Sequence, residues 1–133
     1  MQSLREKVFE YVSKKYLSKI EYLWESTPNC AVFRHNDNKK WFGIVMDVSK
    51  NRFGIDDNTI IDVLNVKVTD FALRDFLLHK DGIFVGYHMN KRYWLSVFLD
   101  GSVKEKDVLN LIDISFEETS KNKKIKKQFK IKT

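Results

Sequence analysis

The chain contains two pairs of short β-branched and aromatic runs, and a few polar residues separate the members of each pair. The first pair is "CAVFRH" and "KWFGIVMDV", joined by the tip "NDNK". The second pair is "IFVGYHM" and "RYWLSVFL", joined by Asn90-Lys91. This spacing predicts β-hairpins, and a hairpin pairs its strands antiparallel. The sequence therefore predicts a sheet that is mostly antiparallel.

Each predicted hairpin places particular side chains together. In the first, a tight tip puts Phe33 and Phe42 on one face of the sheet and Arg34 and Trp41 on the other.

In the second hairpin, a two-residue tip at Asn90-Lys91 places residues 87–89 opposite residues 94–92, so that Tyr87 faces Trp94. Gly86 lies inside the predicted strand, where glycine usually marks a bulge or the close approach of another group.

Three helices accompany these strands. Residues 3–6, "SLRE", have the form of a capping box and begin a predicted helix over about residues 3–19. "FALRDFLLHK" predicts a short helix capped by Thr69 or Asp70. A second capping-box form at residues 102–105 begins a last helix, whose apolar stripe is Val108, Leu111, Ile112, Ser115 and Phe116.

The run "TIIDVLNVKV" supplies a further strand between the first hairpin and the short helix. The predicted order is helix, three strands, helix, two strands, helix. This order indicates an α+β fold, in which a mostly antiparallel, twisted sheet has its helices packed on one face.

Charge divides the chain into a body and a tail. The last 13 residues, "KNKKIKKQFKIKT", hold seven lysines and no acid, whereas the first 120 residues carry 17 basic and 18 acidic side chains. We therefore predict one domain over residues 1–120 and a basic, flexible tail over residues 121–133. The net charge of +6 consequently describes the tail and not the body.

The residue types argue against catalysis and against a metal or other cofactor. Cys30 is the only cysteine, and the three histidines (His35, His79 and His88) fall in separate predicted elements. Neither a nucleophile elbow nor a glycine-rich phosphate loop occurs. The apolar runs are far shorter than the roughly 20 residues of a membrane span. We expect a cytoplasmic protein that is not an enzyme.

The segments "AVFRHNDNKKWFGIVMDV", "IDVLNVKV", "GYHMNKRYWLSVFLDGSV" and "LIDISFEETSKNKK" resemble the MmcQ/YjbR family of small bacterial proteins. The resemblance implies a fold similar to bacterial frataxin and type III secretion chaperones. It also implies DNA binding, which is ascribed to the family by structural analogy to a two-winged motif. The residues that match the family pattern are Arg34, Lys40, Trp41, Asn65, Lys67, Tyr87, His88, Asn90, Lys91 and Trp94.

These residues, together with Arg92, form the predicted contact set. In the DNA-binding hypothesis the cations Arg34, Lys40, Lys67, Lys91 and Arg92 contact phosphates without sequence preference. The aromatic side chains Trp41, Tyr87 and Trp94 offer stacking surfaces, and the tail adds charge.

Two other classes of function remain open. A pocket for a small ligand or peptide would use Trp41, Asn65, Lys67, Tyr87, His88 and Trp94. A chaperone-like role would need an exposed apolar patch. For the tail, an anionic membrane surface ranks below nucleic acid.

Overall fold

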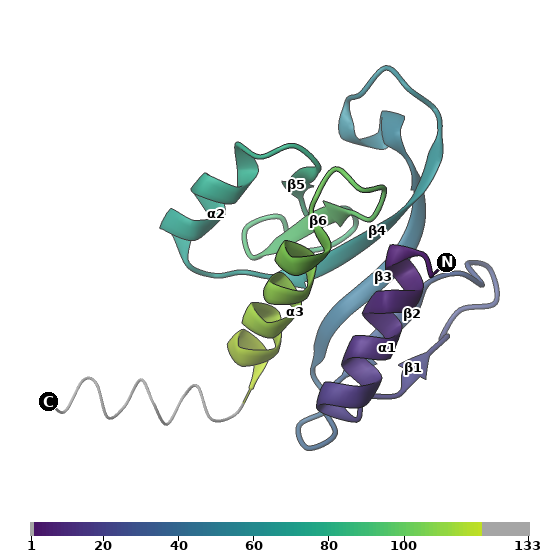
Figure 1. Cartoon of the computed structure of the whole chain (residues 1–133), viewed down its shortest axis with the longest axis vertical. Helices are drawn as coiled ribbons and strands as arrows, with labels where there is room; N and C mark the ends of the chain where they lie inside the picture. Colours follow the sequence, from purple (N-terminus) through teal and green to yellow (C-terminus); the bar gives the residue numbers. More distant parts are fainter. Residues whose placement is uncertain (1, 121–133) are drawn as a thin grey trace, which may run out of the picture.

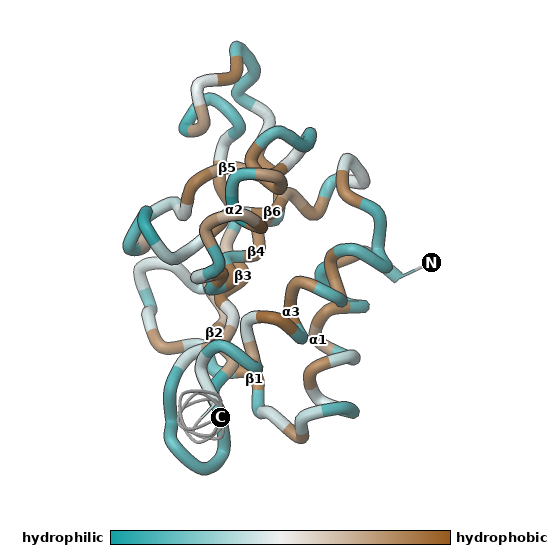
Figure 2. The backbone as a smooth tube through the Cα atoms, turned by 90° about the vertical axis from the view of Figure 1, so that its left-hand side faces the viewer, coloured by the Kyte–Doolittle hydropathy of each residue, from teal (hydrophilic) through white to brown (hydrophobic). Residues whose placement is uncertain are grey.

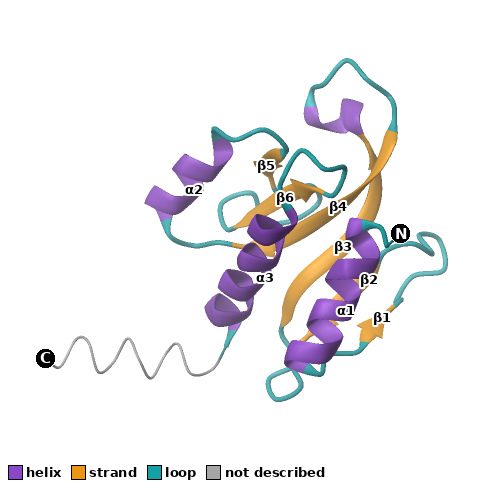
Figure 3. Cartoon of the chain, viewed as in Figure 1, coloured by secondary structure: helices purple, strands orange, loops and turns teal. Residues whose placement is uncertain are grey.

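The helices and strands follow the predicted order, with one additional strand. The computed structural model describes residues 2–120, so the predicted basic tail lies outside the described residues. The elements are α1 (Leu4–Tyr16), β1 (Ile20–Glu21), β2 (Ala31–Arg34), β3 (Trp41–Ser49), the 3-10 helix η1 (Lys50–Phe53), β4 (Ile60–Lys67), α2 (Phe71–Leu78), β5 (Ile83–Val85), β6 (Trp94–Phe98) and α3 (Glu105–Thr119) (Figure 1, Figure 3).

All six strands form one antiparallel sheet in the order β1-β2-β3-β4-β6-β5. The predicted α+β class and the antiparallel sheet are therefore confirmed. The additional strand, β1, has only two residues and pairs Ile20 with Phe33. A strand of two residues carries too little alternation to be recognised in a sequence.

The three helices contribute to one hydrophobic core on the same face of the sheet. In Figure 1 α1 and α3 run side by side in front of the strands, with α2 beside α3. Figure 2 shows the strands mostly in hydrophobic colours and many of the turns in hydrophilic ones. The core side chains from the helices are Val8, Val12, Leu77, Val108, Leu111 and Ile112, and those from the sheet include Phe33, Val45, Leu64, Val66, Leu95 and Val97.

The opposite face of the sheet, called the open face below, is covered by loops. One cluster on it contains Cys30, Val32 and Ile44, and Met89 from the β5–β6 loop packs against this cluster. A second contains Val48, Val63 and Phe98, with η1 and Tyr87 packed against it. Because loops cover this face only in part, it can still present side chains to solvent.

The first hairpin has the predicted faces. The rings of Phe33 and Phe42 lie 5.9 Å apart in the core. Arg34 pairs directly with Trp41, and its guanidinium lies 5.7 Å from the Trp41 ring centroid. The register shifts between Phe33 and Arg34, a β-bulge that keeps both pairs on their proper faces.

The predicted second hairpin is wrong in register by one residue. The structure pairs Val85 with Leu95, and the Gly86 amide donates to the Trp94 carbonyl. Residues 86–93 form a loop in place of a two-residue tip. In this loop the Asn90 carbonyl accepts hydrogen bonds from the amides of Tyr93 and Trp94. These bonds curl the chain into a helical turn, which takes up more residues than a two-residue tip.

The predicted cap of the last helix is also misplaced. The N-cap of α3 is Lys104, and the Ser102 hydroxyl donates to the Asp100 carboxylate at 2.6 Å. Asp100 accepts the Ser102 amide as well, so it closes the preceding turn. The cap of α2 is Asp70, one of the two predicted residues.

Candidate nucleic-acid interface

Neighbouring strands bring four residues of the predicted contact set together at one end of the sheet. Arg34 ends β2 and pairs with Trp41, the first residue of β3. Lys67 ends β4 and pairs with Trp94, the first residue of β6, so Tyr93 lies just before that strand. Since β2, β3, β4 and β6 are adjacent, these positions follow one another across the sheet.

Ser115 of α3 connects β3 to β4 at this end. Its hydroxyl accepts a hydrogen bond from the Lys67 amide at 2.8 Å and donates to the Phe42 carbonyl at 2.6 Å. Trp41, next to Phe42, therefore lies on the strand beside Lys67. Asn65 and Lys67 are two positions apart on β4, so both side chains point to the open face.

Cationic and aromatic groups alternate along this end of the molecule. The Lys67 ammonium lies 5.9 Å from the Tyr93 ring centroid. The Arg92 guanidinium lies 5.7 Å from the ring centroids of both Tyr93 and Phe71. We call Arg34, Trp41, Lys67, Tyr93, Arg92 and Phe71 the cation–aromatic row.

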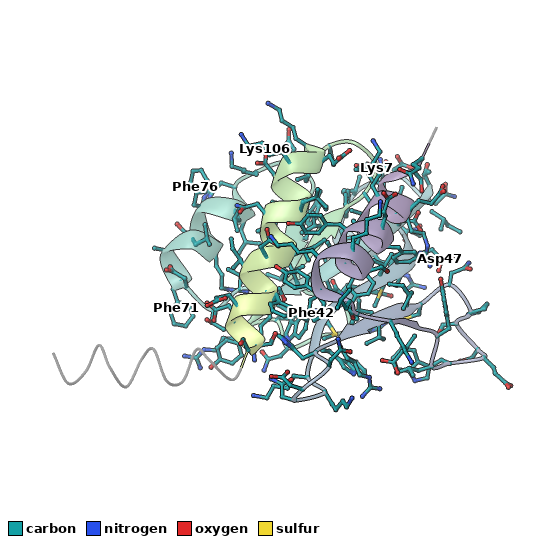
Figure 4. All side chains as sticks on the ribbon, turned by 60° about the horizontal axis from the view of Figure 1, so that its bottom comes forward. Lys7, Phe42, Asp47, Phe71, Phe76 and Lys106 are labelled. Atoms are coloured by element: carbon teal, nitrogen blue, oxygen red, sulfur yellow. The ribbon has the colours of Figure 1, made fainter. Side chains whose placement is uncertain are left out.

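The row has an exposed ring at each end: Trp24 adjoins the row, and Phe71 is its last member. Trp24 packs edge-on against Trp41 at 5.9 Å and is 40% exposed. Phe71 begins α2, is 60% exposed and projects from the helix (Figure 4). Such rings can accept a stacked base on the free face.

The C-terminal end of α3 lies beside the row. The Asn38 side chain donates to the Thr119 carbonyl at 2.9 Å, and the Thr69 hydroxyl donates to Glu118. Asn38 belongs to the β2–β3 turn and Thr69 follows β4. Ser120, the last described residue before the lysine-rich part of the sequence, therefore lies near the row.

His35 anchors the β2–β3 turn to α3 in the interior. Its Nε2 lies 2.7 Å from the Thr119 hydroxyl, and its ring packs on Phe116 with centroids 4.1 Å apart. Burial lowers the pKa of His35 by more than nearby Asp37 raises it. The imidazole is accordingly neutral at pH 7 and serves as a structural link.

Two residues of the predicted contact set are buried, so their side chains cannot contact a nucleic acid or ligand. Asn65 is fully buried, donates to the Tyr87 carbonyl at 3.2 Å and accepts from the Ser96 hydroxyl at 2.5 Å. Trp94 is also buried, directly against Gly86. These two side chains hold the β5–β6 loop on the sheet.

Other predicted contact residues give that loop its shape. The Lys91 ammonium donates to the Gly86 carbonyl, and the Asn90 side chain accepts from the Arg92 amide. His88 has a left-handed backbone with φ of 59°. Tyr87 packs beside Phe53. Among the predicted cations, Arg34, Lys67 and Arg92 belong to the row, and Lys40 is exposed in the adjacent turn.

Sequence reasoning did not select Trp24, Phe71 or Tyr93 for the contact set. Phe71 carried a usable signal, because the buried stripe of α2 includes Leu73 and Leu77 and leaves an aromatic first residue outside it. Trp24 lies in a segment without periodicity, so nothing in the sequence marks its contact with Trp41.

A separate concavity of about 450 Å³ on the open face does not match the predicted ligand pocket. From that prediction it includes only Tyr87 and His88, next to Cys30, Ser49 and Arg52. Burial raises the pKa of the Cys30 thiol, which disfavours the reactive thiolate.

Two features are absent from residues 2–120. Within this part of the chain no three His, Cys, Asp or Glu side chains gather as metal ligands. None of its helices has the length and apolar character needed to cross a membrane.

Fold and site together define a small α+β protein built on one antiparallel sheet, with a cation–aromatic row at one end. The chain belongs to the YjbR family, whose family model matches residues 13–118. It is 40% identical over 115 residues to the Bacillus subtilis (strain 168) protein named "Uncharacterized protein YyaQ", covering 86% of this chain and 97% of that relative. The predicted family resemblance is confirmed.

Solved structures agree with this assignment. A crystal structure of a Pseudomonas syringae protein superposes with a TM-score of 0.83 at 39% identity, covering 90% of this chain and all of that one. A Deinococcus radiodurans protein with a DUF419 domain gives a TM-score of 0.67 at 20% identity, covering 90% of this chain and 80% of that one. The second match shows the fold alone.

Proposed function

We propose that the protein is a cytoplasmic, non-enzymatic binding protein for nucleic acid, with DNA as its expected partner. The observation that carries this proposal is the cation–aromatic row beside the start of the lysine-rich segment. The row offers charge and stacking surface on the same strip, and the seven lysines of the segment extend the charge.

Two cations of the row, Lys67 and Arg92, are available for phosphates, unlike the cations of α1. On α1, Arg5, Lys7, Lys14 and Lys15 each pair with a carboxylate. Within residues 2–120, Lys67 and Arg92 form no ion pair and lie over aromatic rings instead. Arg34 pairs with Glu21 at 2.8 Å, so it chiefly positions Trp41.

A salt titration of DNA binding tests the proposal. Fluorescence anisotropy with labelled DNA between about 50 and 200 mM salt should show the logarithm of affinity falling linearly and steeply with the logarithm of salt. The double variant Lys67→Gln/Arg92→Gln should bind more weakly, with a slope smaller in magnitude by roughly 1 to 2.

A matched control removes the same charge elsewhere. The double variant Lys80→Gln/Lys106→Gln replaces one exposed lysine just after α2 and one on α3. Its DNA affinity and salt slope should stay close to those of the parent. Equal losses in both double variants would mean that net charge alone matters. Absence of binding at about 50 mM salt would remove the proposal.

Each of the two alternative classes of function is supported by one structural feature. A small ligand would have the concavity beside Tyr87 and His88, and a chaperone-like partner would have the exposed rings of α2. Since Phe71 already lies over Arg92, we favour nucleic acid for that surface.

A further inference from the structure

We infer that the row binds single-stranded nucleic acid and not the grooves of a duplex. The inference rests on the proposed function and specifies its substrate class. Groove readers insert a helix or a two-stranded ribbon into DNA, so the hairpins and helices near the row decide between the two classes.

The first hairpin cannot act as an inserting ribbon, because its tip is bound to the helices. Asn36 donates to the carbonyl of Leu17 just after α1, and Asn38 donates to the Thr119 carbonyl at the end of α3. His35 adds the buried contact to the Thr119 hydroxyl. A tip held at three points is tied to the ends of α1 and α3, so it is not free to enter a groove as an independent ribbon.

The β5–β6 loop, which takes the place of the second predicted hairpin, is folded down on the sheet. Met89 packs against the cluster of Cys30, Val32 and Ile44 on the open face. The Lys91 ammonium is turned back to the Gly86 carbonyl at 3.1 Å. This loop therefore offers no free ribbon for a groove.

The described helices also lack the character of a recognition helix. The exposed rings of α2 are Phe71 and Phe76, while its Arg74 is buried and donates to the carbonyls of Val68 and Lys91. The α3 sequence "EKDVLNLIDISFEET" is acidic and would repel phosphates. The cations of α1 are neutralised by carboxylates.

The row instead has the composition of a single-strand platform. Its rings come from the start of β3 (Trp41), the residue before β6 (Tyr93) and the start of α2 (Phe71). The cations Lys67 and Arg92 lie against these rings. A flexible strand can turn its bases onto successive rings while its phosphates meet Lys67 and Arg92. A duplex keeps its bases stacked inside and cannot use the exposed face of Phe71.

The experiment compares one labelled DNA oligonucleotide with its duplex at about 150 mM salt, where purely electrostatic binding is weakened. The full chain should bind the single strand about fivefold or more tightly than the duplex. Phe71→Ala and Tyr93→Ala should each weaken single-strand binding by roughly 5- to 150-fold and leave duplex binding unchanged.

Phe76→Ala is the matched control, because Phe76 is on the same helix and is 59% exposed, almost as much as Phe71. Its Lys80 neighbour lies 4.8 Å from the ring, so it too is an exposed cation–aromatic pair, but outside the row. Single-strand affinity should be unaffected by this change.

Three outcomes would contradict the inference in distinguishable ways. Equal or tighter duplex binding overturns it and leaves the proposed function standing. A single-strand preference that survives both Phe71→Ala and Tyr93→Ala also overturns it, since stacking would then occur elsewhere. If neither DNA binds even at about 50 mM salt, the inference and the proposed function both fall.

Discussion

At the scale of single residues, His35 shows how a polar side chain can be needed in the interior. It is 3% exposed, and it joins the turn next to Lys40 to the end of α3 through Thr119. The groups that face its ring are Asp37, the Phe116 backbone, and Lys40. Burial is the largest influence and lowers the pKa below its usual value of 6.5.

The sign of the resulting pH dependence follows from this direction. Below about pH 6.5 the unfolded chain binds a proton at His35 that the folded chain resists. The free energy of unfolding should therefore fall as pH is lowered from about 7.5 to 5.5, by at most about 1.4 kcal/mol per pH unit from this group.

Urea unfolding of the parent and of His35→Gln over that range measures the effect. The variant should be less stable at pH 7.5 but should lose less stability on acidification. His79→Gln removes an exposed histidine and should keep the parental pH dependence. Parallel pH profiles for the parent and His35→Gln would contradict this account of the buried imidazole.

At the scale of elements, the β5–β6 loop depends on Gly86. A Cβ atom at this position would lie 2.8 Å from the Trp94 Cβ and 3.0 Å from its carbonyl oxygen. Gly86→Ala should therefore destabilise the fold by about 1 to 3 kcal/mol, because β5 and β6 must separate to admit the methyl group.

A chemical denaturation midpoint measures that loss, and Val85→Ala on the exposed side of β5 is the control. Val85 is 43% exposed, so its truncation should cost much less than the added methyl. An unchanged midpoint for Gly86→Ala would mean that the loop tolerates a wider strand separation than the structure indicates.

The same loop shows which parts of the fold the sequence could predict. Alternation and capping patterns are local, so the helices, the main strands, and the faces of Phe33 and Trp41 followed from neighbouring residues. The register of β5 and β6 did not, because it depends on Asn65, which is 31 positions from its hydrogen-bond partner Ser96.

The candidate site was predictable in part for the same reason. Arg34 and Trp41 pair within one hairpin, so their proximity could be read from the sequence. The contact of Arg92 with Phe71 joins a loop to a helix start, and Asn65 has the residue type of a contact but the burial of a core residue. Only the three-dimensional packing separates these cases.

At the scale of the whole molecule, α3 links the core to the row. Its apolar stripe lies in the core, Ser115 joins β3 to β4, and Thr119 holds the β2–β3 turn. In the sequence, the lysine-rich segment follows Ser120, the residue that caps α3. The body contributes a shaped row with few charges, and the segment contributes many charges.

Truncation after Ser120 separates these two contributions. All the described helices and strands end before that position, so the shortened chain should still show the circular dichroism of a folded α+β body. Loss of seven lysines should weaken single-strand binding and reduce the salt slope by up to about 5 in magnitude. The affinity ratio between the shortened chain and its Phe71→Ala variant should equal that of the full-length pair, because stacking on the row does not need the segment. If the shortened chain binds nothing at about 50 mM salt while the full chain binds, the lysine-rich segment alone is the binding site and the row has no part in it.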